Sequence, residues 1–320
     1  MIHINRDAAL PSIAVYNKAT VGPKEAKKTR AARELEDAIK HFTDPENYLN
    51  NEKLCRSSFG FNVYKDKALK GALHDVFGNK CAYCDSYFGH VTPKDIEHFR
   101  PKSEVDTPTL DKLQPGYYWL AGDWHNLLVS CPDCNRGREH QLPGQSELLK
   151  RGKHTQFPLQ DERERVRHHG RNILDEEPYR LLLNPCIDQP EIHFTYDEEA
   201  LIFPRVQGDA RAETSIVVYA LQRGGLVKDR KRVLNDLTLK LQLLSLLSVE
   251  MARAVNKKNA DDISEKQNQL RILILSIGMM FKRDAPYLGM VRDCLRRQLE
   301  SGELDDVVRA RIDLQQLLSI

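Results

Sequence analysis

The alternation of apolar and polar residues predicts helices at both ends of the chain and short strands between them. Near the N-terminus, apolar residues recur at helical spacing over residues 23–43, where Pro23 suits the first turn. A second helix is predicted over residues 64–77, and Gly78 is suited to end it. The chain therefore opens with two helices that each carry one apolar face.

From about residue 210 the pattern is helical to the end of the chain. Leucines stack on one face of a helix predicted over residues 231–255, and a further helix is predicted over residues 263–281. This last helix carries apolar residues around more of its circumference than one packed neighbour can cover. The residues outside its main apolar face are Ile272, Leu275 and Met279. We interpret them either as buried in a four-helix C-terminal domain or as a surface for a homodimer or a partner.

Short strands are expected in the middle of the chain, where apolar and polar residues alternate or where short apolar runs precede turn residues. The predicted strands are residues 96–99, 127–129, 181–183, 193–196 and 201–203, the last two forming a hairpin. Neighbouring residues of a strand point to opposite faces. Glu97 and His98 can therefore serve one site only if the first strand bends, which the following Pro101 favours.

Two cysteine pairs bracket a segment of 46 residues. Cys81 and Cys84 form one C-x2-C knuckle, and Cys131 and Cys134 form another. This spacing lets each pair supply two corners of a tetrahedral Zn²⁺ site. Because four thiolates leave no open coordination position, zinc bound here would be structural. The chemistry is therefore expected on the segment between the knuckles and directly after it.

A helix is predicted after the second knuckle. On it Asn135 and Glu139 would lie four residues apart and so share one face. The same helix would turn the next residue, His140, by about 100° from that face.

The order of His98, Asn126 and Asn135 around the two knuckles resembles the ββα-metal fold of HNH endonucleases. The wider phrases IEHFRP, YYWLAGDWHNLL and SCPDCN are similar to the HNH subunit of Septu-type and retron-associated anti-phage systems. That subunit works beside an ABC-type ATPase. A later phrase, LLLNPCIDQPEIHF, is also similar, and the resemblance extends from about residue 80 to residue 232.

The resemblance implies a role for each polar residue of the site. His98 matches the general base, and Asn126 matches the residue that orients the loop of the base. Glu97 and Asn135 match two ligands of a catalytic metal. Oxygen donors suit Mg²⁺ or Mn²⁺ better than zinc, and a neutral imidazole can take a proton from an attacking water.

Two positions depart from the pattern of the family. Glu97 stands where many relatives have aspartate, and Glu139 stands where colicin-type nucleases have a histidine ligand. Glu139 is therefore the expected third ligand of the catalytic metal, with His140 and water as alternatives.

Basic residues near the site are candidates for contacts with nucleic acid. Beside the motifs these are Arg100, Lys102, Arg136 and Arg138. Two basic runs, residues 163–171 and 223–232, are candidate phosphate-contact surfaces, although ordinary exposed helix faces have the same composition. Aromatic residues at 117–119 and 124 could stack on unpaired bases, but we expect them to pack the core, with Trp119 and Trp124 as members.

Composition limits the class of protein. Net charge is only +2, so a nucleic-acid surface must arise from local clustering. The remaining cysteines, Cys55, Cys186 and Cys294, are widely separated, which favours a reducing cytoplasm over a disulfide framework. We expect no membrane span, because no apolar run reaches about 18 residues.

Together these observations predict an α+β protein with a ββα-metal HNH nuclease core, a structural zinc held by four cysteines, N-terminal helices and an α-helical C-terminal domain. We expect an N-terminal arm and helix over residues 1–60, the nuclease domain over 61–160, and a mainly helical domain with a small hairpin over 161–320. The predicted activity is metal-dependent cleavage of DNA with low sequence specificity, as the effector of an anti-phage system with an ATPase partner. The alternatives are cleavage of RNA, including transfer RNA, and a non-catalytic zinc adaptor that docks an ATPase.

Overall fold

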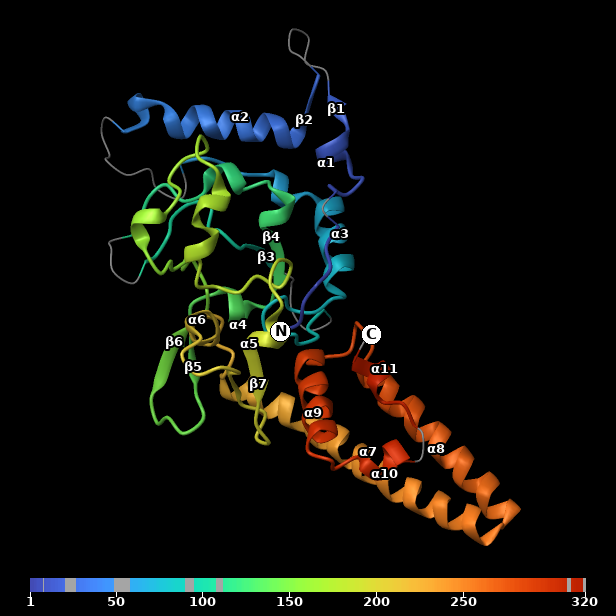
Figure 1. Cartoon of the computed structure of the whole chain (residues 1–320). Coiled ribbons are helices and arrows are strands. Elements are labelled where there is room, and N and C mark those ends of the chain that lie inside the picture. The colour runs from blue at the N-terminus through green and yellow to red at the C-terminus, as the bar shows by residue number, and fades with distance from the viewer. Residues whose placement is uncertain are drawn as a thin grey trace.

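The computed structural model describes residues 1–7, 9–20, 27–48, 58–89, 95–107, 112–309 and 312–318. Helices and strands are mixed along the chain, and the strands pair as separate two-stranded antiparallel ribbons (Figure 1). The fold is thus a mixture of helix and sheet, as expected.

The N-terminal part lays one long helix across one end of the molecule (Figure 1). Its elements are α1 (Ala14–Asn17), β1 (Ala19–Thr20), β2 (Lys28–Thr29) and α2 (Arg30–Thr43). The side chain of Thr29 accepts a hydrogen bond from the Ala32 amide and so caps α2. The predicted helix therefore begins at Arg30, and its expected first residues at 23–26 lie outside the described part of the chain.

Helix α3 (Lys67–Phe77) confirms the second predicted helix. The carboxylate of Asp66 accepts hydrogen bonds from the amides of Ala68 and Leu69 at its start. Gly78 ends it in the left-handed conformation at φ +56°, where a side chain would be strained. The first cysteine knuckle follows directly.

Strands β3 (Asp95–His98) and β4 (Leu127–Ser130) confirm the two strands expected around the site. They pair antiparallel, with Glu97 opposite Leu128 and His98 opposite Leu127. Helix α3 packs against β4, and the single-turn helix α4 (Pro132–Asn135) follows β4. The second knuckle thus joins the end of a buried strand to the start of a short helix.

The predicted helix through Asn135 and Glu139 is wrong. Helix α4 ends at Asn135, and the chain continues as strand β5 (Arg138–Gln141), which pairs antiparallel with β6 (Leu148–Arg151). The backbone groups that a longer helix would bond to one another are paired across this hairpin instead. Glu139 consequently lies on an exposed strand and not one turn above Asn135.

The segment after this hairpin is largely irregular. It contains 3₁₀ turns over Glu162–Glu164 and Ile173–Tyr179, and residues 181–183 form no strand, contrary to expectation. Helix α5 (Pro190–His193) then leads into β7 (Phe194–Tyr196) and β8 (Ile202–Pro204), which pair antiparallel and confirm the predicted small hairpin.

The C-terminal part is helical, as predicted, and includes a long antiparallel pair of helices, α7 and α8, that projects from the rest of the molecule (Figure 1). Its helices are α6 (Ala210–Val218), α7 (Gly224–Lys257), α8 (Ala260–Met280), α9 (Leu288–Glu300), α10 (Asp305–Arg309) and α11 (Gln315–Leu318). Leu273 and Ile277 of α8 are buried, but Ile272, Leu275 and Met279 are 69%, 63% and 58% exposed. Burial in a helical domain is therefore the wrong interpretation for these three exposed residues. We call Ile272, Leu275 and Met279 the outer stripe of α8.

One continuous hydrophobic cluster joins the parts of the molecule. It runs from Met1 and α3 through β4 and the knuckles to helices α7 and α9. The aromatic prediction holds for Tyr117, Tyr118 and Trp124, which are buried, whereas Trp119 is only half-buried. Among the described residues, none of the helices is long and apolar enough to cross a membrane.

Candidate functional site

The four predicted zinc ligands converge on one point. Their Sγ atoms all lie within 4.8 Å of one another, and those of Cys84 and Cys131 are 3.8 Å apart. A tetrahedral ion with Zn–S bonds of about 2.3 Å separates its sulfurs by about 3.8 Å. All four cysteines are buried and unbridged. The geometry and the donor set therefore fit a structural metal ion such as zinc.

An arginine that the sequence did not indicate reaches this cluster. The buried guanidinium of Arg223 donates to the Sγ atoms of Cys134, Cys84 and Cys131 at 3.4, 3.5 and 3.6 Å. Burial alone would lower the pKa of Arg223, but the thiolates raise it well above its ordinary value. This positive charge offsets part of the negative charge of the thiolates and joins the cluster to the start of α7.

The basic run at 223–232 is therefore not a continuous phosphate-contact surface. Arg223 is committed to the cysteines, and Arg230 is 1% exposed and donates to the backbone oxygen of Leu221. The predicted phosphate-contact surface at 163–171 is wrong in part for the same reason. Arg165 is 3% exposed and holds Glu162 and the hydroxyl of Tyr117.

A hollow of about 450 Å³ opens beside β3 and brings three of the predicted catalytic and metal-binding residues together. Glu97 and His98 from β3 and Asn135 from α4 all line it, together with Lys102, Arg136 and His154. Glu97 and His98 are neighbours on a strand, but β3 ends at His98, so both reach the same space. We call this space the β3 hollow.

His98 is held in one orientation by its surroundings. Its Nε2 lies 3.0 Å from the backbone oxygen of Ala121, and a carbonyl can only accept, so Nε2 carries the proton. Nδ1 is then the acceptor, and the Lys102 Nζ lies 3.4 Å from it. Burial, together with the charge of Lys102, lowers the pKa of His98 well below its ordinary value. The imidazole is therefore neutral at physiological pH.

Glu97 is buried against a lysine. The Lys153 Nζ lies 2.6 Å from Glu97 Oε1 and also donates to the backbone oxygen of His98 at 3.0 Å. Burial raises the pKa of Glu97 and lowers that of Lys153, and the attraction between the two groups opposes both shifts. The only carboxylate deep in the β3 hollow, among the described residues that line it, is thus paired with an ammonium group.

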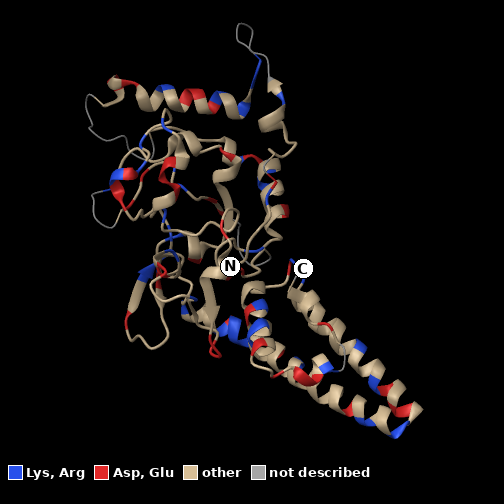
Figure 2. Cartoon of the chain, viewed as in Figure 1, with Lys and Arg blue, Asp and Glu red and all other residues tan. Residues whose placement is uncertain are grey.

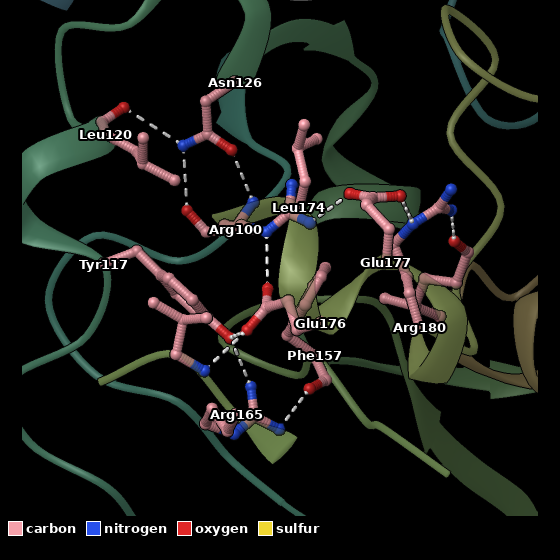
Figure 3. Close-up of polar contacts among 12 residues, drawn as sticks. Arg100, Tyr117, Leu120, Asn126, Phe157, Arg165, Leu174, Glu176, Glu177 and Arg180 are labelled. Atoms are coloured by element: carbon pink, nitrogen blue, oxygen red, sulfur yellow. Dashed lines mark hydrogen bonds and ion pairs between the residues drawn. The ribbon is translucent and has the colours of Figure 1, made fainter. Parts of the chain in front are cut away.

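Asn126 clamps the loop that follows β3. Its Oδ1 accepts from the Arg100 amide at 2.7 Å, and its Nδ2 donates to the backbone oxygens of Arg100 and Leu120 at 3.0 and 3.1 Å (Figure 3). Because Leu120 is adjacent to Ala121, the same side chain positions the carbonyl that binds His98. Asn126 thus ties the loop after β3 to the segment that carries the carbonyl partner of His98.

Arg100 does not face solvent, so its predicted contact with nucleic acid is wrong. Its side chain is buried and its Nε donates to Glu176 Oε1 at 2.6 Å, while its terminal nitrogen pairs with Glu177 (Figure 3). Glu176 is 0% exposed and also accepts from the Tyr117 hydroxyl and the Val166 amide. This buried network fastens the irregular segment at 160–180 to the end of β3.

The other predicted cations have different positions. Lys102 lies in the β3 hollow, and exposed Arg136 lines its rim and makes a two-bond ion pair with Asp95 at 2.9 Å. Exposed Arg138 pairs with Asp133 at 3.0 Å and lies at a different hollow. Over the chain as a whole, basic and acidic residues are interspersed (Figure 2). The β3 hollow itself is lined by more basic than acidic side chains: Lys65, Lys70, Lys102 and Arg136 against Asp95 and Glu97.

The structure does not bring Glu139 to the other predicted metal ligands. Glu139 and His140 lie on β5 and line a hollow beside Cys131 and Arg223, not the β3 hollow. Lys153 and His154, which the sequence did not indicate as site residues, lie beside Asn135 instead, because the chain returns to α4 after β6. The amides of these two residues bond to the backbone oxygens of Cys134 and Asn135. The only sign of these two site residues in the sequence was that two basic residues, Lys153 and His154, follow each other directly.

No protein-family model matches the chain. Over 276 residues it is 32% identical to the Septu protein PtuB of Bacillus mycoides strain KBAB4, an alignment that covers 82% of this chain and 88% of that protein. The chain belongs to the PtuB family of Septu proteins.

Two further relatives carry Septu names. A Septu protein PtuB of Bacillus thuringiensis is 32% identical over 101 residues, which is 30% of this chain and 35% of that protein. The Septu protein PtuA of Bacillus mycoides strain KBAB4 is 25% identical over 239 residues, which is 74% of this chain and 30% of that protein. Membership of the PtuB family places this chain among the components of Septu anti-phage systems.

Proposed function

We propose that this PtuB-family protein is a metal-dependent HNH endonuclease that cuts DNA with low sequence specificity. The observation that carries the proposal is a buried, neutral His98 whose acceptor nitrogen lies in a basic hollow shared with Glu97 and Asn135. The order β3, β4, α4 around a cluster of four cysteines supports the ββα-metal core that the sequence motifs imply.

In the proposed reaction His98 accepts a proton from the attacking water at Nδ1, because its Nε2 is committed to Ala121. Glu97 and Asn135 would hold Mg²⁺ or Mn²⁺, which when bound polarises the scissile phosphate and stabilises the leaving oxygen. Asn126 keeps the loop of the imidazole in register. Lys102 and Arg136 bind phosphate oxygens at the hollow and its rim.

Incubation of the purified protein with Mg²⁺ or Mn²⁺ and with plasmid, a short DNA duplex or total transfer RNA tests this function. We expect the purified protein to nick plasmid and cut a short duplex. Glu97→Ala and Asn135→Ala should each abolish cleavage without loss of zinc, because the cysteine cluster is a separate site. The matched controls Glu139→Ala and His140→Ala should cleave like the unchanged protein, since both residues line another hollow.

The alternatives give distinct results in the same experiment. If total transfer RNA is cut and the plasmid stays intact, the substrate is RNA and not DNA. A folded, zinc-loaded protein that cuts none of the three would contradict the nuclease and favour an adaptor that docks its partner. Strong loss of cleavage in Glu139→Ala would contradict the assignment of Glu97 and Asn135 as sufficient protein ligands.

We also propose that the projecting pair α7 and α8 docks the PtuA partner. The support is the outer stripe of α8 together with Leu239, Leu243 and Leu246 of α7, which are 66%, 46% and 55% exposed. The Septu protein PtuA contains, within a much longer sequence, a stretch similar to most of this chain. Two proteins that act together are often found joined in one chain, and this similarity therefore supports PtuA as the partner. The relatives' partner is expected to be an ABC-type ATPase.

Polar substitutions on the outer stripe test this docking. Leu275→Gln with Met279→Gln should change the free energy of unfolding by only about 0.5 kcal/mol per site, because both side chains are exposed. Cleavage should persist, while co-purification with the co-expressed PtuA partner and protection against phage are lost. The matched control is Leu174→Gln, an equally exposed leucine elsewhere.

Two outcomes would contradict the docking surface. Unfolding of the doubly substituted chain would show that the stripe is core, and retained binding to PtuA would show that the partner docks elsewhere. Light scattering of the unchanged chain decides the homodimer alternative: a dimer that becomes a monomer on these substitutions would assign the stripe to a second copy.

A further inference from the structure

Lys153 is a completely buried lysine directly beside the proposed metal ligand. It is 0% exposed, and its ammonium group contacts Glu97 Oε1 at 2.6 Å and the backbone oxygen of His98 at 3.0 Å. A buried charge is stable only when it is paired and hydrogen-bonded. The ion pair with Glu97 therefore belongs to the resting structure of the protein.

The backbone of Lys153 is bonded to the second knuckle. Its amide donates to the backbone oxygen of Cys134 at 2.8 Å. The preceding Gly152 has φ +118°, and a Cβ there would lie 2.0 Å from the backbone oxygen of Arg136. Glycine is thus required for the chain to pass this close to the second knuckle. The knuckle fixes the position of Lys153 under β3.

The charges around the β3 hollow favour an anion over a cation. Lys65, Lys70 and Lys102 line it. Its two carboxylates each have a cationic partner, since Asp95 makes a two-bond pair with Arg136 and Glu97 is paired with Lys153. A divalent cation that enters without nucleic acid meets this positive charge, and its one buried carboxylate ligand is already neutralised.

We propose that Lys153 makes metal binding by this site conditional on nucleic acid. The ammonium group competes with the divalent cation for Glu97, so the free protein binds Mg²⁺ or Mn²⁺ weakly. A phosphate group that occupies the hollow adds the negative charge that offsets Lys153 and the neighbouring lysines, and the cation then binds together with the substrate. This inference rests on the proposed nuclease function and adds an order of binding to it.

Mn²⁺ affinity measures this order directly. The parent is the zinc-loaded His98→Ala chain, in which a short DNA duplex is bound but not cut, and free Mn²⁺ is followed by its electron paramagnetic resonance signal. We expect the duplex to tighten Mn²⁺ binding by the parent. Without duplex, Lys153→Met in the same background should bind Mn²⁺ on the order of tenfold tighter than the parent, because a unit charge beside the ligand is removed.

Lys153→Arg is the matched control, since it keeps the charge and should retain weak, duplex-dependent binding. Glu97→Gln removes the carboxylate and should bind little Mn²⁺ under any condition. If Lys153→Met does not fold, as zinc content and circular dichroism would show, Lys153→Gln, which removes the charge but keeps a hydrogen-bond donor for Glu97, takes its place with the same expected result. Equal Mn²⁺ affinity with and without duplex overturns the inference.

Cleavage by the unchanged chain separates this inference from the function on which it rests. A protein that cuts DNA with Mn²⁺ but binds the ion equally well without duplex remains a nuclease, and only the role of Lys153 is rejected. A protein that cuts no nucleic acid with either metal loses the nuclease proposal and the order of binding with it.

Discussion

Replacement of His98 by alanine is expected to lower the rate of cleavage at least about a hundredfold, the usual contribution of a general base. Nucleic-acid binding should persist, because Lys102 and Arg136 remain in place. Rates are measured on plasmid under single-turnover conditions, and binding on a short duplex. The control is His125→Ala, an exposed histidine next to Asn126 that should cleave normally. Near-normal cleavage by His98→Ala would remove the imidazole from the mechanism.

The pH dependence of the cleavage rate tests the same role of His98. The unperturbed imidazole value predicts a fall in rate below about pH 6.5. Burial and the charge of Lys102 lower the pKa of His98, and a lower pKa keeps the ring neutral to lower pH. The fall is therefore expected well below pH 6.5. Lys102→Met should move it upward, toward the ordinary value, because one of the charges that lower the pKa is removed.

Loss of one cysteine ligand is expected to unfold the region around the knuckles. The purified protein should hold about one zinc ion per chain, and binding of structural zinc contributes about 10–16 kcal/mol in small zinc modules, comparable with the whole stability of a domain. Cys131→Ser should lose the ion, and with it the link between the first and the second knuckle. Metal content by mass spectrometry and thermal unfolding by circular dichroism measure both effects.

Cysteines outside the cluster provide the comparison for this substitution. Cys55 lies outside the described part of the chain, so Cys186 is the better control. It is a half-buried free thiol outside the four-cysteine cluster, and Cys186→Ser should keep its zinc and its melting temperature within a few degrees. A Cys131→Ser protein that stays folded, zinc-loaded and active would disprove the shared site. Equal losses in both variants would point to general sensitivity of the fold instead.

Features that depend on a few adjacent residues could be predicted from the sequence. The knuckles, the capped end of α3 at Gly78 and the β7–β8 hairpin all follow from local spacing or turn residues, and the structure contains each of them. The convergence of Glu97, His98 and Asn135 at one hollow came from matching motifs and not from periodicity.

Predictions failed where a distant segment decides the outcome. Residues 135–139 have helical spacing of polar groups, but pairing with residues 148–151 extends the chain after Asn135. Arg100 sits beside the motif like a phosphate contact, yet Glu176 and Glu177, far along the chain, draw it inward. In the same way Arg223 approaches the cysteines from the start of α7.

The sequence by itself determined the four cysteines of the cluster and the two strands of the candidate centre, because short-range spacing and local alternation decide these. Only the tertiary structure decided which charges lie beside that centre. Lys153 pairs with Glu97 across a long stretch of chain, since a buried carboxylate requires a partner and the returning hairpin supplies one. The partner of a buried charge is set by packing, which no local pattern encodes.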